Sequence, residues 1–170
     1  NASDDNSQVM VANYNEPSQI VISGHREACE KAVKWLNENY KEKFRAIELN
    51  VSAPFHSSLM QPAAEKLAQY LEKIEIKPLS IPYIANIDAK IYPAKTEAKT
   101  LRHNLYEQVC GSVYWTQSIQ DISNDSIFIE VGPGSVLSGL IKKIKPMAKI
   151  IALDTATAYS ELDHLFGANS

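Results

Sequence analysis

One histidine stands in a sequence context suited to proton transfer. The alternation of apolar and polar residues over 44–51 predicts a strand, and Ser57 or Ser58 can cap a helix that carries Pro62 in its first turn. His56 would then lie at a strand-to-helix junction, held by two elements but still reachable. This position makes His56 the candidate catalytic base, although a histidine that only packs or caps in a loop is the plainer reading of the same residues.

A catalytic histidine needs a nucleophile to act on and a partner for its second ring nitrogen. The chain contains no G-x-S-x-G elbow, because Ser135 and Ser138 lack glycines two residues away on both sides. Three carboxylates at the ends of predicted strands could orient the ring, namely Asp88, Glu130 and Asp154. Their spacing in the sequence does not choose among them.

A glycine-rich turn precedes one of the predicted helices. The stretch 132–135 (Gly-Pro-Gly-Ser) could hold an anion with its backbone N–H groups, but it lacks the lysine and the spacing of a phosphate-binding loop. A tight structural turn is therefore the favoured interpretation. Three lysines that follow it, Lys142, Lys143 and Lys145, form a small basic cluster or a solvated helix face.

Length, composition and net charge limit the possible classes of protein. A length of 170 residues with 45% hydrophobic content fits one domain, or one domain with a small lobe, with enough apolar side chains for a core. The formal net charge is −3, which gives no global attraction to nucleic acid or to an anionic membrane. No nucleic-acid partner and no metal site are expected.

Cysteine usage and hydropathy predict the compartment. Cys29 and Cys110 lie far apart and have no metal-ligand spacing, so we expect free thiols in a reducing environment. Residues 1–8 are polar and should be disordered or form a loop, and no run of about eighteen apolar residues occurs, which argues against secretion and against a membrane-spanning segment. A cytoplasmic location is the expectation.

The first third of the chain predicts a small subdomain. Strands over 9–12 and 19–24 are close enough in sequence to form an antiparallel pair, a helix with apolar periodicity follows from His25 to Tyr40, and a strand is expected over 44–51. The order strand, strand, helix, strand is that of a ferredoxin-like (α+β) unit without its first strand and helix. We predict such a subdomain over residues 1–51.

The remainder, residues 52–170, predicts part of an α/β core. The run 127–131 is almost continuously apolar, which is typical of a parallel strand covered on both faces, and a helix follows it after the glycine-rich turn. Only about three strands are expected here, fewer than a free-standing sheet normally has. Both lobes are short of strands, so we expect sequence to be missing before residue 1. The other elements expected are helices over about 60–74, 101–109, 115–122 and 162–166, strands over 83–85 and 149–153, and a polar surface connection over 90–99.

Four motifs in the same order resemble those of the malonyl-CoA:acyl carrier protein transacylase family. The resemblance extends from about residue 8 to about residue 145 and covers the later part of the family sequence. The family's earlier part, with its oxyanion loop, its G-H-S-x-G elbow and the arginine that holds the malonyl carboxylate, has no counterpart here. The motifs are Asn13-Tyr14-Asn15-Glu16-Pro17-Ser18-Gln19 with the strand after it, Ser52-Ala53-Pro54-Phe55-His56-Ser57-Ser58-Leu59-Met60, Trp115 with Gln117-Ser118-Ile119, and Glu130-Val131-Gly132-Pro133-Gly134 with Val136-Leu137.

The resemblance implies a ping-pong acyl transfer and a role for each matching residue. Malonyl-CoA is the implied substrate and acyl carrier protein the implied partner, with coenzyme A released and no bound cofactor. His56 matches the base that accepts the serine proton, and the backbone carbonyl of Gln108 matches the group that orients it. Asn15 and Gln19 match the loop lining the cleft, and Phe55 matches an aromatic that disfavours branched acyl groups. The implied fold is a partial hydrolase-like parallel-sheet core with the partial ferredoxin-like subdomain.

Two other functions share these motifs. An acyltransferase that serves a polyketide synthase in trans would carry every one of them. A non-catalytic module that binds acyl carrier protein would keep the same surface without the nucleophile. This chain alone is expected to be inactive, since the implied serine lies in the missing N-terminal portion.

Overall fold

The computed structural model describes residues 7–40 and 44–167. Most of the predicted N-terminal loop, residues 1–6, lies outside the described residues. Among the described helices, none is long and apolar enough to cross a lipid bilayer. The elements are β1 (Val9–Glu16), β2 (Gln19–Gly24), α1 (Arg26–Asn39), the short 3₁₀ helix η1 (Ser58–Met60), α2 (Gln61–Leu71), β3 (Tyr83–Ile84), β4 (Ile91–Tyr92), α3 (Ala98–Cys110), α4 (Trp115–Gln120), β5 (Ile127–Val131), α5 (Val136–Ile144), β6 (Lys149–Leu153) and α6 (Ala156–Phe166).

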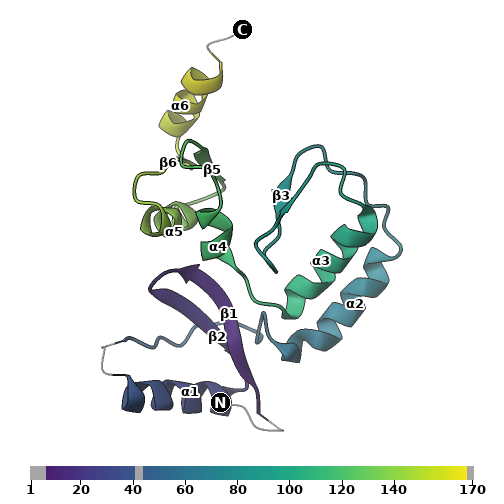
Figure 1. The fold of residues 1–170 in the computed structure, drawn as a ribbon, viewed down its shortest axis with the longest axis vertical. Coiled ribbons are helices and arrows are strands. Elements are labelled where there is room, and N and C mark those ends of the chain that lie inside the picture. The colour runs from purple at the N-terminus through teal and green to yellow at the C-terminus, as the bar shows by residue number, and fades with distance from the viewer. Residues whose placement is uncertain (1–6, 41–43, 168–170) are drawn as a thin grey trace.

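The first two strands form the predicted hairpin. β1 pairs with β2 in antiparallel register, with Val9 opposite Gly24 and Glu16 opposite Gln19. α1 follows and lies beside the hairpin (Figure 1). Both the antiparallel pair and the helix are therefore confirmed.

The strand predicted over residues 44–51 is absent. This segment has no regular secondary structure, and Ile47 and Val51 are 63% and 59% exposed. A strand needs a neighbour for its N–H and C=O groups, and no described strand lies beside this one. The alternating pattern is present, but the described part of the chain offers it no pairing partner, so this prediction was wrong.

The helices α2 and α3 pack against each other. The prediction of Pro62 in the first turn of α2 is confirmed. Arg102 of α3 donates from Nε to the Leu71 carbonyl (2.9 Å) and from Nη2 to the Ile74 carbonyl (2.9 Å), so it satisfies carbonyls that the end of α2 leaves free. This contact fixes the α2–α3 pair, which lies side by side in Figure 1.

The polar connection predicted over residues 90–99 contains a strand. β4 pairs with β3 as a short antiparallel ladder, Tyr83 opposite Tyr92, and these two rings stack with centroids 5.3 Å apart. The prediction missed β4 because two apolar residues among polar ones give no periodicity. β3 thus belongs to its own hairpin.

β5 and β6 lie where strands were expected, and they pair with each other in parallel, with Ile127 opposite Lys149 and Val131 opposite Leu153. A small core of Ile119, Ile141 and Ala148 joins α4, α5 and the start of β6. However, Val131 is 79% exposed, so the expectation that β5 is covered on both faces is wrong for the described residues. The second face of β5 has nothing from those residues packed over its end.

The molecule is therefore a mixed α/β structure with small sheets. In the described residues the strands form three separate two-stranded sheets and no larger sheet. Figure 1 shows the elongated arrangement: α1 and the β1–β2 hairpin at one end, α6 at the other, and the α2–α3 pair to one side. β1 connects the parts, because Asn13 and Val113 form a parallel bridge just before α4.

Candidate active site

His56 lies in a tight turn that leads into η1 and α2. Its backbone has φ +57°, the left-handed region that a non-glycine residue adopts only when its surroundings hold it there. Ser57 does this: it is 1% exposed, and its hydroxyl donates to the Pro54 carbonyl at 2.6 Å. The expected role of Ser57 as a side-chain helix cap is absent, since its hydroxyl closes the turn instead.

The ring of His56 is oriented by the end of α3. Nδ1 lies 3.0 Å from the Gln108 carbonyl oxygen and 3.2 Å from that of Gly111. Carbonyl oxygens only accept, so Nδ1 carries the proton and donates it to them. In the neutral ring Nε2 then keeps its lone pair, and in the described part of the chain it has no hydrogen-bond partner.

Gly111 is the site residue that sequence reasoning missed. The last carbonyls of a helix have no partner within the helix, and the helix predicted over about 101–109 ends just before Gly111. That end was the available signal, because any helix terminus exposes several carbonyls to a neighbouring donor. The contact with Gln108 has the form that the resemblance implies, and its catalytic role stays a prediction.

Side chains around His56 join the turn to its neighbours. Ser58 donates its hydroxyl to the Gln8 side chain at the start of β1. Gln61 donates to the Tyr106 hydroxyl at 2.7 Å and accepts from the Cys110 thiol at 3.6 Å, which ties the start of α2 to the end of α3. Burial raises the pKa of Cys110 and keeps it as a neutral thiol.

Asn15 and Gln19 lie at the turn between β1 and β2. The Asn15 Nδ2 donates to the Gln19 Oε1 at 3.2 Å, so the structure brings these two predicted residues together. Their described hydrogen bond is to each other, whereas the described hydrogen bonds of His56 run to α3. Phe55, next to His56, is 48% exposed.

Two of the three carboxylates considered as partners of the ring, Asp88 and Glu130, bond to other groups. Asp88 accepts from the Lys90 backbone N–H (3.0 Å) and from the Tyr92 hydroxyl (2.9 Å). Glu130 accepts from the N–H groups of Leu137 (3.0 Å) and Ser138 (2.8 Å), so it caps α5. The hydroxyl and N–H of Ser138 and the N–H of Leu137 hold the pKa of Glu130 below its ordinary value, although burial opposes them.

The glycine-rich turn and the lysines after it have structural roles. Glu130 occupies the N-terminus of α5, where an anion would have been held. Lys142 donates to the Ala148 carbonyl (2.8 Å), Lys145 to the Ile122 carbonyl (2.6 Å), and Lys143 pairs with Glu16. The favoured interpretation of a structural turn is consistent with these contacts.

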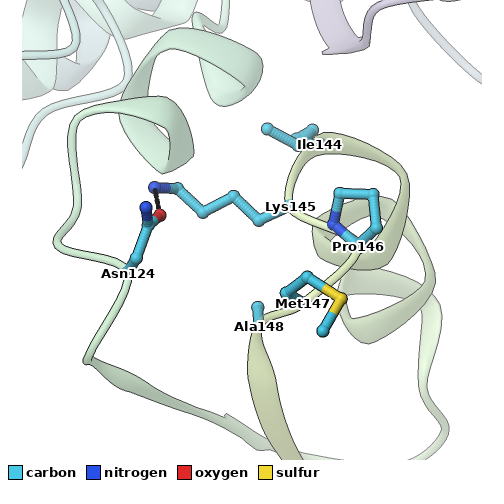
Figure 2. Close-up of a pocket in the computed structure, with 6 residues that line it drawn as sticks. All are labelled: Asn124, Ile144, Lys145, Pro146, Met147 and Ala148. Atoms are coloured by element: carbon cyan, nitrogen blue, oxygen red, sulfur yellow. Dashed lines mark hydrogen bonds between the residues drawn. The ribbon is translucent and has the colours of Figure 1, made fainter.

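A surface pocket of about 340 Å³ lies at the end of α5, away from His56. Figure 2 shows that Lys145 crosses it to reach the Asn124 side chain, at 2.9 Å. The Lys145 ammonium is therefore already satisfied by groups of the chain. The described residues also hold no cluster of three His, Cys, Asp or Glu side chains that could bind a metal ion. The residues that line the surface pocket are Asn124, Ile144, Lys145, Pro146, Met147 and Ala148.

Comparisons with known proteins point in one direction. The family model described as "Acyl transferase domain" matches residues 1–155. The malonyl CoA-acyl carrier protein transacylase of Bacillus subtilis (strain 168) is 44% identical over 147 residues, which are 85% of this chain and 45% of that protein. The polyketide biosynthesis malonyl CoA-acyl carrier protein transacylase PksC of the same organism is 42% identical over 143 residues, 83% of this chain and 48% of that protein.

Solved structures give the same likeness. A chain in the complex of a type II polyketide-synthase acyl carrier protein with its malonyl-transacylase is 37% identical and has a TM-score of 0.84. The match covers 94% of this chain and 51% of that chain. This chain therefore spans about half the length of the relatives it matches.

Proposed function

Because this chain belongs to the malonyl-CoA:acyl carrier protein transacylase family, we propose that it is part of an enzyme that transfers a malonyl group from malonyl-CoA to the phosphopantetheine thiol of acyl carrier protein. The observation that carries the proposal is the orientation of His56. Two backbone carbonyls fix the proton on Nδ1, and Nε2 is free to take a proton from a nucleophile. Fatty-acid biosynthesis is the pathway in which this transfer is proposed to act.

His56 acts as general base and then as general acid. A serine hydroxyl attacks the malonyl thioester while Nε2 takes its proton, and the same proton passes to the departing coenzyme A thiol. The acyl carrier protein thiol then repeats the sequence in reverse, with Nε2 as base and the serine oxygen as leaving group. During both steps the partial negative charges of the Gln108 and Gly111 carbonyls face the imidazolium that forms.

The nucleophile is proposed to lie in the part of the family sequence that this chain does not span. The serines next to His56 are engaged, since Ser57 donates to the Pro54 carbonyl and Ser58 to Gln8. The complete enzyme is thus this chain together with the earlier part of the family sequence. Residues 1–51 would complete a ferredoxin-like subdomain there, and residues 52–170 a hydrolase-like core.

Asn15, Gln19 and Phe55 are proposed to contact the substrate. Asn15 and Gln19 would line the cleft from the β1–β2 turn. Phe55 is next to the base and about half exposed, so its ring is available to crowd the carbon between the two carbonyls of the malonyl group. The cytoplasm is the proposed location, and malonyl-CoA and acyl carrier protein the proposed substrates.

A polyketide pathway is the second candidate, because PksC is almost as similar to this chain (42% identical) as the Bacillus subtilis transacylase first named (44%).

The test incubates the complete enzyme with malonyl-CoA and phosphopantetheinylated acyl carrier proteins of both pathways, and mass spectrometry measures the malonyl group on each. Faster transfer to the fatty-acid carrier protein supports the proposal, and faster transfer to the polyketide carrier protein supports the second candidate. Carrier-protein binding without any transfer would mean a non-catalytic module.

A further inference from the structure

Glu16 is a buried carboxylate that the chemistry above does not use. It is 5% exposed, although it lies at the end of β1 beside a surface turn. One oxygen, Oε2, accepts from the Ser18 backbone N–H at 2.8 Å, and the Ser18 hydroxyl lies 3.0 Å from both carboxylate oxygens. A buried charge of this kind is costly unless it is paired.

The counter-charge comes from α5. Nζ of Lys143 lies 3.1 Å from Oε1 of Glu16, and the lysine side chain is 57% exposed. The Ser18 N–H and the Lys143 ammonium hold the pKa of Glu16 below its ordinary value, although burial opposes them. Glu16 is therefore ionised at neutral pH, and the ion pair joins residues that are 127 positions apart.

The ion pair anchors the turn that carries Asn15 and Gln19. The neighbouring Tyr14 is fixed to the start of α4, because its N–H donates to the Val113 carbonyl (2.9 Å) and its carbonyl accepts from the Thr116 hydroxyl (3.0 Å). Beyond Tyr14, the described hydrogen bonds from residues 15–19 to elements outside the hairpin all run through Glu16 and Lys143. Without that pair, the described side-chain hydrogen bonds of the turn would all lie within the hairpin.

The strand is also irregular at this point. Tyr14 pairs with Ile20 and Glu16 with Gln19, so the register skips Asn15. Such an irregularity re-aims the side chain of the extra residue and bends the strand, and it needs local support. Glu16, the next residue, is where α5 supplies that support.

We propose that the Glu16–Lys143 ion pair is a positioning contact that holds the Asn15–Gln19 turn in the orientation needed to bind the acyl-thioester substrate. This inference rests on the proposed function, in which Asn15 and Gln19 line the cleft. Glu16 and Lys143 do not touch the substrate. They act through the turn, so their loss weakens binding and leaves the chemical step at His56 intact.

The test compares Lys143→Met, Lys143→Arg and Glu16→Gln in the complete enzyme. Lys142→Met is the matched control, because it removes the same charge from the same helix while Lys142 contacts the Pro146 and Ala148 carbonyls and not Glu16. Steady-state kinetics with malonyl-CoA give KM and kcat for each variant. Thermal unfolding shows whether Lys143→Met and Lys142→Met are folded to the same extent.

Lys143→Met and Glu16→Gln should raise KM by about threefold to fivefold and change kcat by less than about twofold, the size expected of an ion pair with one exposed partner. Lys143→Arg should keep the KM of the wild type, since its guanidinium can replace the ammonium. Lys142→Met should also keep it. If Lys143→Met matches Lys142→Met in KM, or if Lys143→Arg behaves like Lys143→Met, the inference is overturned.

A second readout does not depend on activity. The enzyme is labelled with ¹³C at glutamate carboxyls, and the Glu16 resonance is assigned by its loss in Glu16→Gln. This resonance should titrate at a higher pH in Lys143→Met than in the wild type. In Lys142→Met its titration should be unchanged. An unchanged Glu16 titration in Lys143→Met contradicts the ion pair itself. Complete enzyme that folds but transfers no malonyl group contradicts the proposed function, whereas active enzyme with unaltered variants contradicts only this inference.

Discussion

The proton on the His56 ring is held at Nδ1 by two carbonyl oxygens, which can only accept a hydrogen bond. Two backbone carbonyls accept from Nδ1, so their effect does not depend on the side chain of Gln108, and the neutral ring presents a basic Nε2. Substituting Gln108 should accordingly leave the orientation of the ring unchanged as long as α3 keeps its end. Removing the ring is the substitution that tests its role.

We predict that His56→Asn lowers kcat of the complete enzyme by about 10²–10⁴-fold, the usual loss when an acid–base group is removed. Asparagine is the better test variant because it accepts the left-handed backbone found at this position (φ +57°), whereas alanine adds strain. His56→Ala should lose at least as much activity. Rates of malonyl transfer are measured alongside the melting temperature, and near-normal turnover by folded His56→Asn would reject His56 as the base.

Phe55 should make the enzyme selective for the size of the acyl group. Phe55 directly precedes His56 in the chain and is proposed to contact the acyl group, so a methyl branch on the malonyl carbon should meet its ring. One such carbon is worth about 1–3 kcal/mol in a pocket. Phe55→Ser should therefore bring the kcat/KM values of malonyl-CoA and methylmalonyl-CoA closer together. Phe55→Tyr keeps the ring and should keep the preference. If the ratio in Phe55→Ser equals that of the wild type, Phe55 does not contact the acyl group.

At the residue scale, sequence and resemblance together indicate the candidate site residues but not all of their contacts. The His56 ring and the Gln108 carbonyl lie 52 residues apart, so no local pattern joins them, and only the resemblance indicates the pair. Ser57 or Ser58 was expected to cap a helix, and Ser57 instead donates its hydroxyl to the Pro54 carbonyl. Serine hydroxyls can bond to several nearby backbone groups, and the choice depends on the turn that forms.

Elements with strong local periodicity were predictable from sequence alone. The helices α1, α2, α3 and α5 and the strand β5 lie where the pattern of apolar residues indicated them. The strand prediction for residues 44–51 failed for a non-local reason. The alternating pattern of this segment is suited to a strand, but pairing needs a neighbouring strand that the described residues do not supply. β4 was not predicted for a local reason, since its two residues are too few to show a period.

The cap on α5 gives a prediction at this scale. Glu130 accepts from two N–H groups of the first turn, so Glu130→Gln should lower the free energy of unfolding by about 1 kcal/mol at neutral pH. The folded-state pKa of Glu130 is lowered, so the carboxylate stabilises the fold above its unfolded pKa of about 4.3. That contribution is lost as pH falls through the folded-state pKa.

The measurement is urea unfolding of the complete enzyme at several pH values. The difference between wild type and Glu130→Gln should be largest above about pH 5 and should shrink toward lower pH. Glu161→Gln, which removes an exposed carboxylate of α6, is the control and should have little effect at any pH. A difference for Glu130→Gln that is the same from pH 7 down to pH 3 would contradict the cap.

The whole molecule presents apolar surface where a larger structure would cover it. Ile47, Leu49 and Val51 are exposed along a segment without a strand partner, and Val131 and Val136 are exposed around the end of β5. The chain also spans about half the length of its relatives while matching one of them with a TM-score of 0.84. Surfaces of this kind are normally covered by packing against further polypeptide. We therefore expect the earlier part of the family sequence to pack against them.

This arrangement predicts where the malonyl group is attached. Incubation of the complete enzyme with malonyl-CoA should label one serine in the earlier part of the sequence and none of the four serines considered in this chain. Ser57 is buried, and Ser57, Ser58 and Ser138 donate their hydroxyls to Pro54, Gln8 and Glu130, so none of these three hydroxyls is available to His56. The fourth, Ser135, precedes α5 in the turn after β5, whereas the ring of His56 is held by the end of α3. Peptide mapping by mass spectrometry of the trapped malonyl-enzyme locates the label.

The 170-residue chain by itself provides the complementary test. With its apolar surfaces uncovered it should bind a hydrophobic dye and associate, and it should take no malonyl group from malonyl-CoA. Supplying the earlier part of the sequence as a separate chain should reduce the dye signal and restore malonylation together, because the same polypeptide covers the surfaces and carries the nucleophile. A stable 170-residue monomer that becomes malonylated on one of its own serines would disprove both expectations, and it would place the nucleophile among residues of this chain.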